Sequence, residues 1–339
     1  MSDAKQAVNS GEVFDLLVIG SGPNGLAVAI EAQKAGLRTV MVEKGCICNS
    51  IYHFPAHMVF FTTSELVEIG GLPFSCANPK PTRAEALEYY RKAVEHFGLD
   101  VRQYRRVDRV EGEDNNFTVH AVDRYGRAEN YRTRKIVLAT GYFDLPNRLG
   151  IPGAELSKVD HYYKDPHPYA GHDVVVVGGK NSAAIAALEL WRHGARVTLV
   201  HRGAVLHQHV KYWIKPDIEN RIKAGEINAW FNSTLAEVTP DTVVVETPFG
   251  KQTLANDFVL ALTGYHPDFA FMERLGIRIE GEYRMPAHNP ETLETNVAGI
   301  YLAGVLVAGA RTNDVFIENG RFHGQRIVAA LQTALAKTD

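Results

Sequence analysis

The chain has 339 residues, of which 45% are hydrophobic and 22% are charged. This composition is ordinary for a folded protein and excludes a disordered or fibrous one, and the length allows two domains with their own cores. The net charge of −3 provides no long-range attraction to nucleic acid or to an anionic membrane. We therefore expect a soluble protein whose partners do not include nucleic acid or a membrane.

Compartment and metal content follow from the termini and the cysteines. Residues 1–14 lack a basic stretch followed by an apolar core, and the longest apolar run, residues 299–310, is too short and too glycine-rich to span a bilayer. Cys46, Cys48 and Cys76 are too few and too irregular for a disulfide framework, and their spacing does not match a zinc site. The sequence therefore predicts a cytoplasmic protein without a metal site.

One pattern of 32 residues occurs twice, at 14–45 and at 172–203. Each copy has an apolar strand, a turn of small residues, a helix that ends near Gly36 or Gly194, and a second apolar strand. This is the βαβ pattern of dinucleotide-binding domains. Two copies in one chain predict an α/β fold with two Rossmann-like domains, one for a bound flavin dinucleotide and one for an exchangeable nicotinamide dinucleotide.

The first copy has the features of an FAD site. Its glycines allow a tight turn, close approach to a pyrophosphate and close packing of a helix over 24–35, and Glu43 ends the second strand, where a carboxylate accepts hydrogen bonds from ribose hydroxyls. Asn24 and Ser50 are expected to hold the pyrophosphate or ribityl chain, and His53 is either a proton donor or an ordinary loop histidine. The candidate FAD-binding residues here are Gly20, Ser21, Gly22, Pro23, Asn24, Gly25, Glu43, Lys44, Ser50 and His53.

Two later segments distinguish a flavoprotein from a simple dehydrogenase. Residues 135–141 form an apolar strand that ends in Thr140-Gly141, and residues 295–304 form a second one that ends in Gly304. Val305 occupies the position where such flavoproteins usually have aspartate. A final helix is predicted over about 314–335, with its N-terminus directed at the flavin.

The second copy predicts NADPH as the reductant. His201 and Arg202 replace Glu43 and Lys44, so the carboxylate that would repel a 2′-phosphate is absent and Arg202 supplies a cation for it, assisted by His201 and by Arg196 or Lys211. A solvated turn charge is the alternative interpretation of Arg202. The candidate NADPH-binding residues are Gly178, Gly179, Lys180, Asn181, Ser182, Ala183, His201, Arg202 and, at the end of a later strand, Gly264.

The order of these segments predicts a split first domain. The Gly304 strand and the final helix follow the second copy, so we assign residues 1–155 and 286–339 to the FAD domain and residues 156–285 to an inserted NADPH domain. Both predicted joints are rich in proline and glycine.

This domain order resembles the low-molecular-weight thioredoxin reductase architecture over essentially the whole chain. Residues 50–55, 60–64, 69–74, 211–216 and 316–321 are most similar to the bacillithiol disulfide reductase family. The resemblance implies FAD, NADPH, a homodimer, and a low-molecular-weight thiol disulfide, such as bacillithiol disulfide, as substrate.

Two departures concern the catalytic thiol. Residues 162–168 have no Cys-x-x-Cys pair, which excludes the usual dithiol relay of thioredoxin reductases, and Asn24 stands where the bacillithiol family typically has cysteine. Cys46 and Cys48 are interpreted as structural, because a Cys-x-Cys pair closes only a strained ring. The sequence therefore identifies no catalytic residue.

Three other functions remain open on the sequence. A ferredoxin or flavodoxin–NADP reductase of thioredoxin reductase type needs no active-site cysteine, a flavin monooxygenase uses similar glycine turns, and a redox sensor would hold flavin without turnover. The 83–91 helix, with Arg83 and Tyr89-Tyr90-Arg91, is expected to present a solvated face; a dimer interface or an acidic-substrate site is the alternative.

Overall fold

We describe residues 8–335 of the chain in a computed structural model. The chain divides into two compact units. The first unit comprises the chain up to Tyr52, residues Met58–Leu145 and the chain from Tyr265 onward, and the second comprises His53–His57 and Pro146–Gly264. Each unit has its own sheet and core, and each is described separately.

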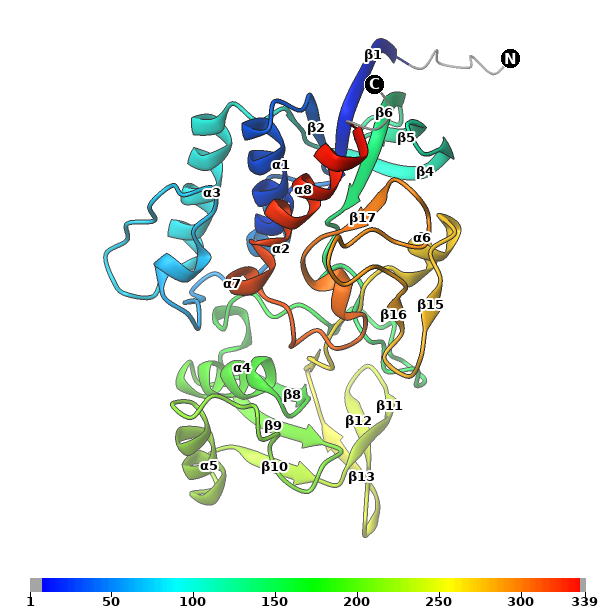
Figure 1. The fold of residues 1–339 in the computed structure, drawn as a ribbon. Helices are drawn as coiled ribbons and strands as arrows, with labels where there is room; N and C mark the ends of the chain where they lie inside the picture. Colours follow the sequence, from blue (N-terminus) through cyan, green and yellow to red (C-terminus); the bar gives the residue numbers. More distant parts are fainter. Residues whose placement is uncertain (1–7, 336–339) are drawn as a thin grey trace. The chain divides into compact units, whose positions relative to one another are not determined.

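A seven-stranded sheet forms the centre of the first unit within residues 8–335, in the order β3-β2-β1-β6-β5-β4 with β17 also paired to β6 (Figure 1). Strands β1, β2, β3, β6 and β17 pair in parallel, whereas β4, β5 and β6 pair antiparallel. The strands are β1 (Val8–Ile19), β2 (Thr39–Val42), β3 (Val101–Arg102), β4 (Arg105–Glu113), β5 (Asn116–Asp123), β6 (Ala128–Leu138) and β17 (Ile300–Leu302).

Helices cover this sheet. α1 contacts β1 and β2, and α8 lies beside α1 (Figure 1). Gly324 permits this close packing, because a Cβ atom there would lie 2.9 Å from the backbone of Ala27 and Val28. The helices of the unit are α1 (Pro23–Lys34), α2 (Asn49–Tyr52), α3 (Arg83–Phe97), α6 (Phe269–Arg274), α7 (Ile317–Gly320) and α8 (His323–Leu335), with 3-10 turns η1 (Ser64–Val67) and η3 (Gly304–Ala308) and a short pair β15 (Ile279–Glu280) and β16 (Met285–Pro286).

The predicted final helix over 314–335 is wrong in its first part. The chain forms two helices there, α7 and α8, and Asp314, where the predicted helix begins, lies in a turn before them. Between the helices, Arg321 turns away and donates from Nη1 to the backbone oxygens of Glu65 and Glu68, at 2.8 Å each. This break places a buried glycine, Gly320, at the end of α7.

The predicted solvated face of the 83–91 helix is also wrong for its tyrosines. Tyr89 and Tyr90 are buried, and their hydroxyls donate to the backbone oxygens of Leu72 and Val67 at 2.8 and 2.9 Å. The long loop before α3 supplies these acceptors, a tertiary arrangement that helical periodicity alone does not reveal. Arg83 likewise donates from Nε to the Ile51 oxygen at 3.1 Å.

The second unit repeats the parallel pattern on a smaller scale. Over the described residues its main sheet has the order β10-β9-β8-β14-β7, all parallel, and a separate antiparallel sheet has the order β11-β12-β13. The elements are β7 (Val159–Asp160), η2 (His167–Tyr169), β8 (Asp173–Val177), α4 (Asn181–Arg192), β9 (Arg196–His201), α5 (Lys215–Lys223), β10 (Asn228–Phe231), β11 (Thr234–Val238), β12 (Thr242–Thr247), β13 (Gly250–Ala255) and β14 (Phe258–Ala261).

The limits of the two units differ from the domain limits predicted after residues 155 and 285. Leu149 and Ile151 pack against the core of the second unit, and a Cβ on Gly153 would lie 1.8 Å from the Val238 oxygen. Conversely, Phe269 and Met272 belong to the core of the first unit. The two units therefore meet at Leu145/Pro146 and at Gly264/Tyr265, before residues 155 and 285.

Among residues 8–335, none of the helices has the length and apolar character needed to cross a membrane.

The capping box of α3 gives a stability prediction. Thr82 Oγ1 accepts a bond from the Glu85 amide at 3.2 Å, and Glu85 Oε2 accepts one from the Thr82 amide at 2.8 Å. Thr82→Ala removes one of these bonds and should cost about 1 kcal/mol. Thermal unfolding should show a lower midpoint for Thr82→Ala and a nearly unchanged one for Thr82→Ser, which keeps the hydroxyl; equal midpoints for all three proteins would contradict the assignment.

Candidate functional site

Three turns of the first unit meet at the carboxyl ends of its parallel strands. β1 runs into the turn at Gly20, β6 into Thr140-Gly141, and β17 into Gly304. The Ala139 amide donates to Ile19 at 2.8 Å, so the ends of β1 and β6 are in register. Ligands of parallel α/β sheets bind at this edge. The structure thus brings together three segments that are far apart in the sequence.

The glycine turn of β1 and α1 is closely packed on one side and open on the other. Gly20 has a φ of +105°, and a Cβ on Gly25 would lie 2.3 Å from the Gly20 oxygen. A Cβ on Gly22 would meet nothing within 4 Å. Gly22 is also the N-cap of α1 and has no side chain to cap the helix. The first-turn amides of α1 therefore border open space, the arrangement that suits an anionic group.

Glu43 lies next to this turn and is buried. Its carboxylate accepts bonds from the Ser21 amide at 2.8 Å, the Ser21 hydroxyl at 3.2 Å and the Gly45 amide at 2.7 Å. Burial raises the pKa of Glu43, although these donors oppose the shift. The carboxylate is thereby fixed beside the glycine turn.

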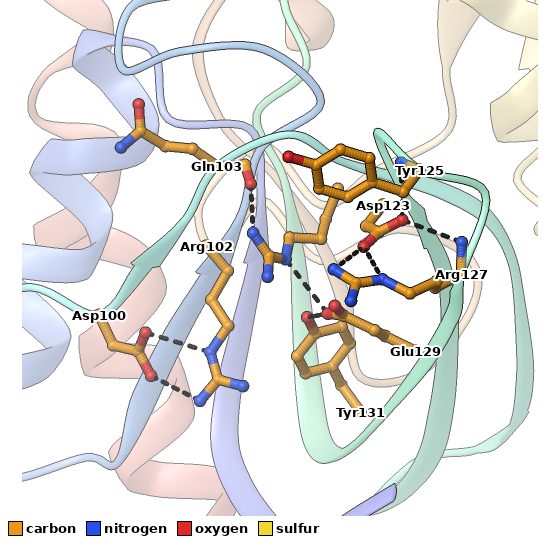
Figure 2. A network of polar contacts seen from close by, with 9 residues as sticks. Asp100, Arg102, Gln103, Asp123, Tyr125, Arg127, Glu129 and Tyr131 are labelled. Carbon is orange, nitrogen blue, oxygen red and sulfur yellow. Dashed lines mark hydrogen bonds and ion pairs between the residues drawn. The ribbon is translucent and has the colours of Figure 1, made fainter. Parts of the chain in front are cut away.

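A polar network holds the backbone around Glu43. The Glu43 amide donates to the Arg102 oxygen at 3.0 Å, and the Arg105 amide donates to the Glu43 oxygen at 2.8 Å. The Arg105 guanidinium donates to the Gln103 oxygen at 2.7 Å and to Glu129 at 3.2 Å, in the network drawn in Figure 2. The strand end that carries Glu43 is therefore held by two backbone bonds to the neighbouring segment 102–105.

Asn24 lies on the first turn of α1 between two glycines from distant segments. A Cβ on Gly304 would lie 2.6 Å from Asn24 Nδ2, and one on Gly320 would lie 2.8 Å from it. Asn24 Oδ1 is buried and has no hydrogen-bond partner. A buried amide oxygen without a donor is costly, so this atom has unused capacity to bind a ligand donor.

His323 fixes the neighbouring turn. Its Nδ1 accepts a bond from the Gly304 amide at 3.1 Å, and burial lowers the pKa of the imidazole to about 4. His323 is therefore neutral at pH 7, with Nδ1 unprotonated. Because Val305 is buried and apolar, this histidine is the polar side chain that contacts the Gly304 backbone in place of an aspartate at 305.

The remaining first-unit candidates occupy different surroundings. Lys44 pairs with Asp144 at 2.8 Å, which places its charge beside the segment that follows Gly141. Ser50 is half-buried in the short helix α2. His53 falls in the second unit with the rest of 53–57, not with the glycine turn. The role of each in cofactor binding stays a prediction.

Neither Cys46 nor Cys48 has the properties of a reactive thiol. Cys48 is fully buried, its Sγ lies 3.5 Å from the Ser21 oxygen, and burial raises its pKa well above the usual value. Burial also raises the pKa of Cys46. Reactive cysteines need a lowered pKa and access to solvent. In residues 8–335, no group of three or more His, Cys, Asp or Glu side chains is arranged to hold a metal ion.

The second glycine turn has the same backbone design as the first. Gly178 has a φ of +148° and donates to the Val200 oxygen at 3.0 Å. Ala183 packs against it, since a Cβ on Gly178 would lie 2.9 Å from that methyl group. The His201 ring covers the next residue: a Cβ on Gly179 would lie 2.3 Å from it. His201 thus occupies the place relative to this turn that Glu43 has in the first unit.

Charged side chains border this turn. Lys180, the N-cap of α4, and Arg202, directly after β9, are exposed. Ser182 is exposed on the first turn of α4. Gly264 ends the neighbouring strand segment with a φ of +90°, and its oxygen accepts a bond from the Asn147 amide at 2.9 Å.

The suggestion that Arg196 assists Arg202 is wrong. Arg196 begins β9, at the other end of the strand from Arg202, and pairs with Asp173 through bonds of 2.7 and 2.9 Å. The six-residue strand β9 separates Arg196 from Arg202, so their equal charges do not bring them to the same site.

Four residues near these turns escaped the sequence analysis: Gly320, His323, His207 and His209. Gly320 and His323 have no local signal, because only the break between α7 and α8 makes them neighbours of Asn24 and Gly304. The two histidines had a weak signal, since they lie in a polar stretch, His207-Gln208-His209, between the apolar residues Leu206 and Val210.

Two sets of parallel strands, each followed by a glycine turn and a helix, define the class of proteins with two dinucleotide-binding folds. The model of the family "Pyridine nucleotide-disulphide oxidoreductase" matches residues 17–304. This chain belongs to that family. The finding confirms the predicted fold class and identifies the protein as an oxidoreductase.

Individual relatives agree with this assignment. Bacilliredoxin reductase Bdr of Bacillus subtilis (strain 168) is 44% identical over 318 residues, which cover 93% of this chain and 96% of the relative. The solved structure of bacillithiol disulfide reductase Bdr (YpdA) from Bacillus cereus has 43% identity and a TM-score of 0.93, covering 95% of this chain and 100% of that one. Thioredoxin reductase from T. acidophilum shares the fold, with 18% identity and a TM-score of 0.74 over 96% of this chain and 99% of that one.

The two outer glycines of the first turn provide a matched pair of variants. Gly25→Ala places a methyl group against the Gly20 backbone and should destabilise the cofactor-free protein by about 1–3 kcal/mol. Gly22→Ala meets no protein atom and should leave that stability within about 0.5 kcal/mol. If the open space beside Gly22 holds a pyrophosphate, Gly22→Ala should still weaken FAD binding, measured as fluorescence of released flavin. Tight FAD binding by Gly22→Ala would argue against this location.

His323 predicts a pH dependence of stability. Its pKa is lowered in the folded protein, so between about pH 6.5 and pH 4 the unfolded chain binds the proton that the folded protein does not. Stability should therefore fall as the pH decreases through this interval, by on the order of 3 kcal/mol in total. His323→Asn keeps an acceptor near the Nδ1 position but does not titrate, so its unfolding midpoint should fall less between pH 6.5 and 4. Parallel midpoint curves for the two proteins would contradict this role.

Proposed function

We propose that the protein is an FAD-dependent, NADPH-dependent reductase of a low-molecular-weight thiol disulfide such as bacillithiol disulfide. The observation that carries this proposal is the similarity to bacillithiol disulfide reductase along essentially the whole chain. The overall reaction converts NADPH, one proton and the disulfide into NADP⁺ and two thiols. A homodimer, which the family resemblance implies, and a cytoplasmic location, which the cysteine content and the N-terminal sequence suggest, remain predictions.

The first unit fits a flavin dinucleotide. Open space beside Gly22, the first-turn amides of α1 and the unpartnered Oδ1 of Asn24 suit the pyrophosphate and the hydroxyl groups of the adjoining chain. The fixed carboxylate of Glu43 suits ribose hydroxyls. A flavin bound here would accept a hydride from the nicotinamide and supply electrons to the acceptor.

The second unit fits NADPH better than NADH. Its first strand pair ends in His201 and Arg202, so the carboxylate that binds the 2′-hydroxyl of NADH is absent. Arg202 and Lys180 are exposed cations suited to a 2′-phosphate. Lys180 replaces the middle glycine of the motif and adds a positive charge beside the turn.

The acceptor half of the reaction is where this chain departs from the family. Asn24 carries no thiol, and Cys48 is buried with a raised pKa. We propose that electrons reach the disulfide without a mixed disulfide to residue 24. The carboxamide of Asn24 neither attacks sulfur nor titrates. In this step the protein therefore orients the two cofactors and the acceptor and excludes water.

Anaerobic rapid mixing tests this proposal. Flavin absorbance should bleach faster with NADPH than with NADH, and it should return when bacillithiol disulfide is added. Asn24→Cys is the control: if a thiol at this position were required, the natural protein would be inactive with the disulfide and the variant active. Return of absorbance only with ferredoxin, or only with oxygen, would instead assign the protein to the carrier reductases or to the oxygen-using flavoproteins.

A further inference from the structure

The loop between β9 and α5 brings two histidines, His207 and His209, close to the glycine turn of the second unit. This segment, residues 202–210, is called the histidine loop below. The His207 amide donates to the Gly179 oxygen at 2.9 Å. Asn181 Nδ2 donates to the His209 oxygen at 3.0 Å, and Asn181 Oδ1 accepts from the Lys211 amide at 2.9 Å. The loop is therefore bonded both to the turn and to the first residue of α4.

Burial of apolar side chains fixes the loop in this position. Leu206, Val210 and Ile214 belong to the core of the second unit, and each is at most 8% exposed. Between Leu206 and Val210, the side chains of His207 and His209 face each other, with ring centroids 4.8 Å apart. The loop thus presents its histidines on a rigid support, which is what a preorganised binding group requires.

The charges that face these imidazoles are positive. Burial is the largest cause of the lowered pKa of both His201 and His207. Arg202 and His207 lower the pKa of His201 further, and Lys180 and His209 lower that of His207 further. No carboxylate contributes to either shift. The cluster therefore has unbalanced positive charge, and both rings are mostly neutral at pH 7.

A dianionic phosphate among these groups would favour the protonated forms of His201 and His207. It offsets the repulsion from Arg202 and Lys180 and accepts hydrogen bonds from imidazolium N–H groups, so both pKa values rise when it binds. We infer that binding of the NADPH 2′-phosphate is coupled to proton uptake by His201, at the end of β9, and by His207 of the histidine loop, so that these two residues form a pH-responsive specificity element for NADPH over NADH. This inference rests on the proposed NADPH dependence.

The sign of the effect follows from linkage. A group whose pKa is higher in the complex than in the free protein strengthens binding at low pH and loses that contribution as the pH rises through its value in the complex. The nucleotide 2′-phosphate is itself mostly dianionic above about pH 6.5, because its second pKa is near 6. A decline in NADP⁺ affinity above that pH therefore reflects loss of protons from the protein and not from the nucleotide.

The test is calorimetric titration of NADP⁺ into the FAD-loaded protein between about pH 6.5 and about pH 8.5. Buffers of different ionisation enthalpy count the protons taken up. We expect net proton uptake and a dissociation constant that rises roughly tenfold over this range, the equivalent of a shift of one pKa unit. NAD⁺, which lacks the 2′-phosphate, should show little pH dependence.

Substitutions distinguish the contribution of the two histidines to the pH dependence from that of the rest of the second unit. His207→Asn should reduce proton uptake and flatten the pH dependence, and His201→Asn should do so as well if the ring that covers Gly179 is not needed for folding. His193→Gln is the matched control, because His193 caps the opposite end of α4. It should behave like the natural protein.

The outcomes distinguish this inference from the proposed function. Tight binding of NADP⁺ without proton uptake, or the same pH dependence for NAD⁺, would overturn the inference and leave NADPH dependence intact. Equal loss of pH dependence in His193→Gln would also overturn it. Absence of NADP⁺ binding at every pH would overturn both the inference and the proposed reductant.

Discussion

Register among parallel strands is the constraint on which both candidate sites depend. β1 pairs with β2 and β6, and β6 pairs with β17, so the chain leaves the sheet at one edge from segments separated by more than 100 residues. Packing then fixes the turns: Gly25 lies against the Gly20 backbone, and Ala183 against Gly178. The second unit uses the same pairing in β8, β9 and β14. The protein therefore uses the same strand–turn–helix backbone arrangement twice, with different side chains around each turn.

Those side chains give the two turns opposite electrostatic character. The first turn lies beside the buried carboxylate of Glu43, which the backbone amides of Ser21 and Gly45 hold in place. The second lies beside His201, with Arg202, Lys180 and the histidine loop around it. A hydrogen-bond acceptor for hydroxyls and a cluster of cations for a phosphate are thus obtained from the same backbone, in a chain whose net charge is only −3.

The sequence predicted the repeated features well because each is local. A glycine turn, the strand before it and the helix after it are adjacent in the chain, so their spacing was sufficient to find Glu43 and Arg202. Features created by distant packing were not predictable. Tyr90 was expected at a solvated face because the loop that buries it has no periodic pattern, and the role of Gly320 depends on a break between α7 and α8 that Arg321 stabilises through two backbone oxygens. The compact units end before residues 155 and 285 because Leu149 and Phe269 join cores formed by other segments.

The carboxamide of Asn24 also determines how this position responds to oxidants. Peroxide converts an exposed thiolate first to a sulfenic acid and then to sulfinic and sulfonic acids that are hard to reverse. A carboxamide has no comparable oxidation products, and the nearby thiol of Cys48 is buried and held in its protonated form. The first-turn position of α1 therefore keeps its chemistry unchanged under the oxidative conditions in which disulfides accumulate. A protein built this way would not need a repair system for residue 24.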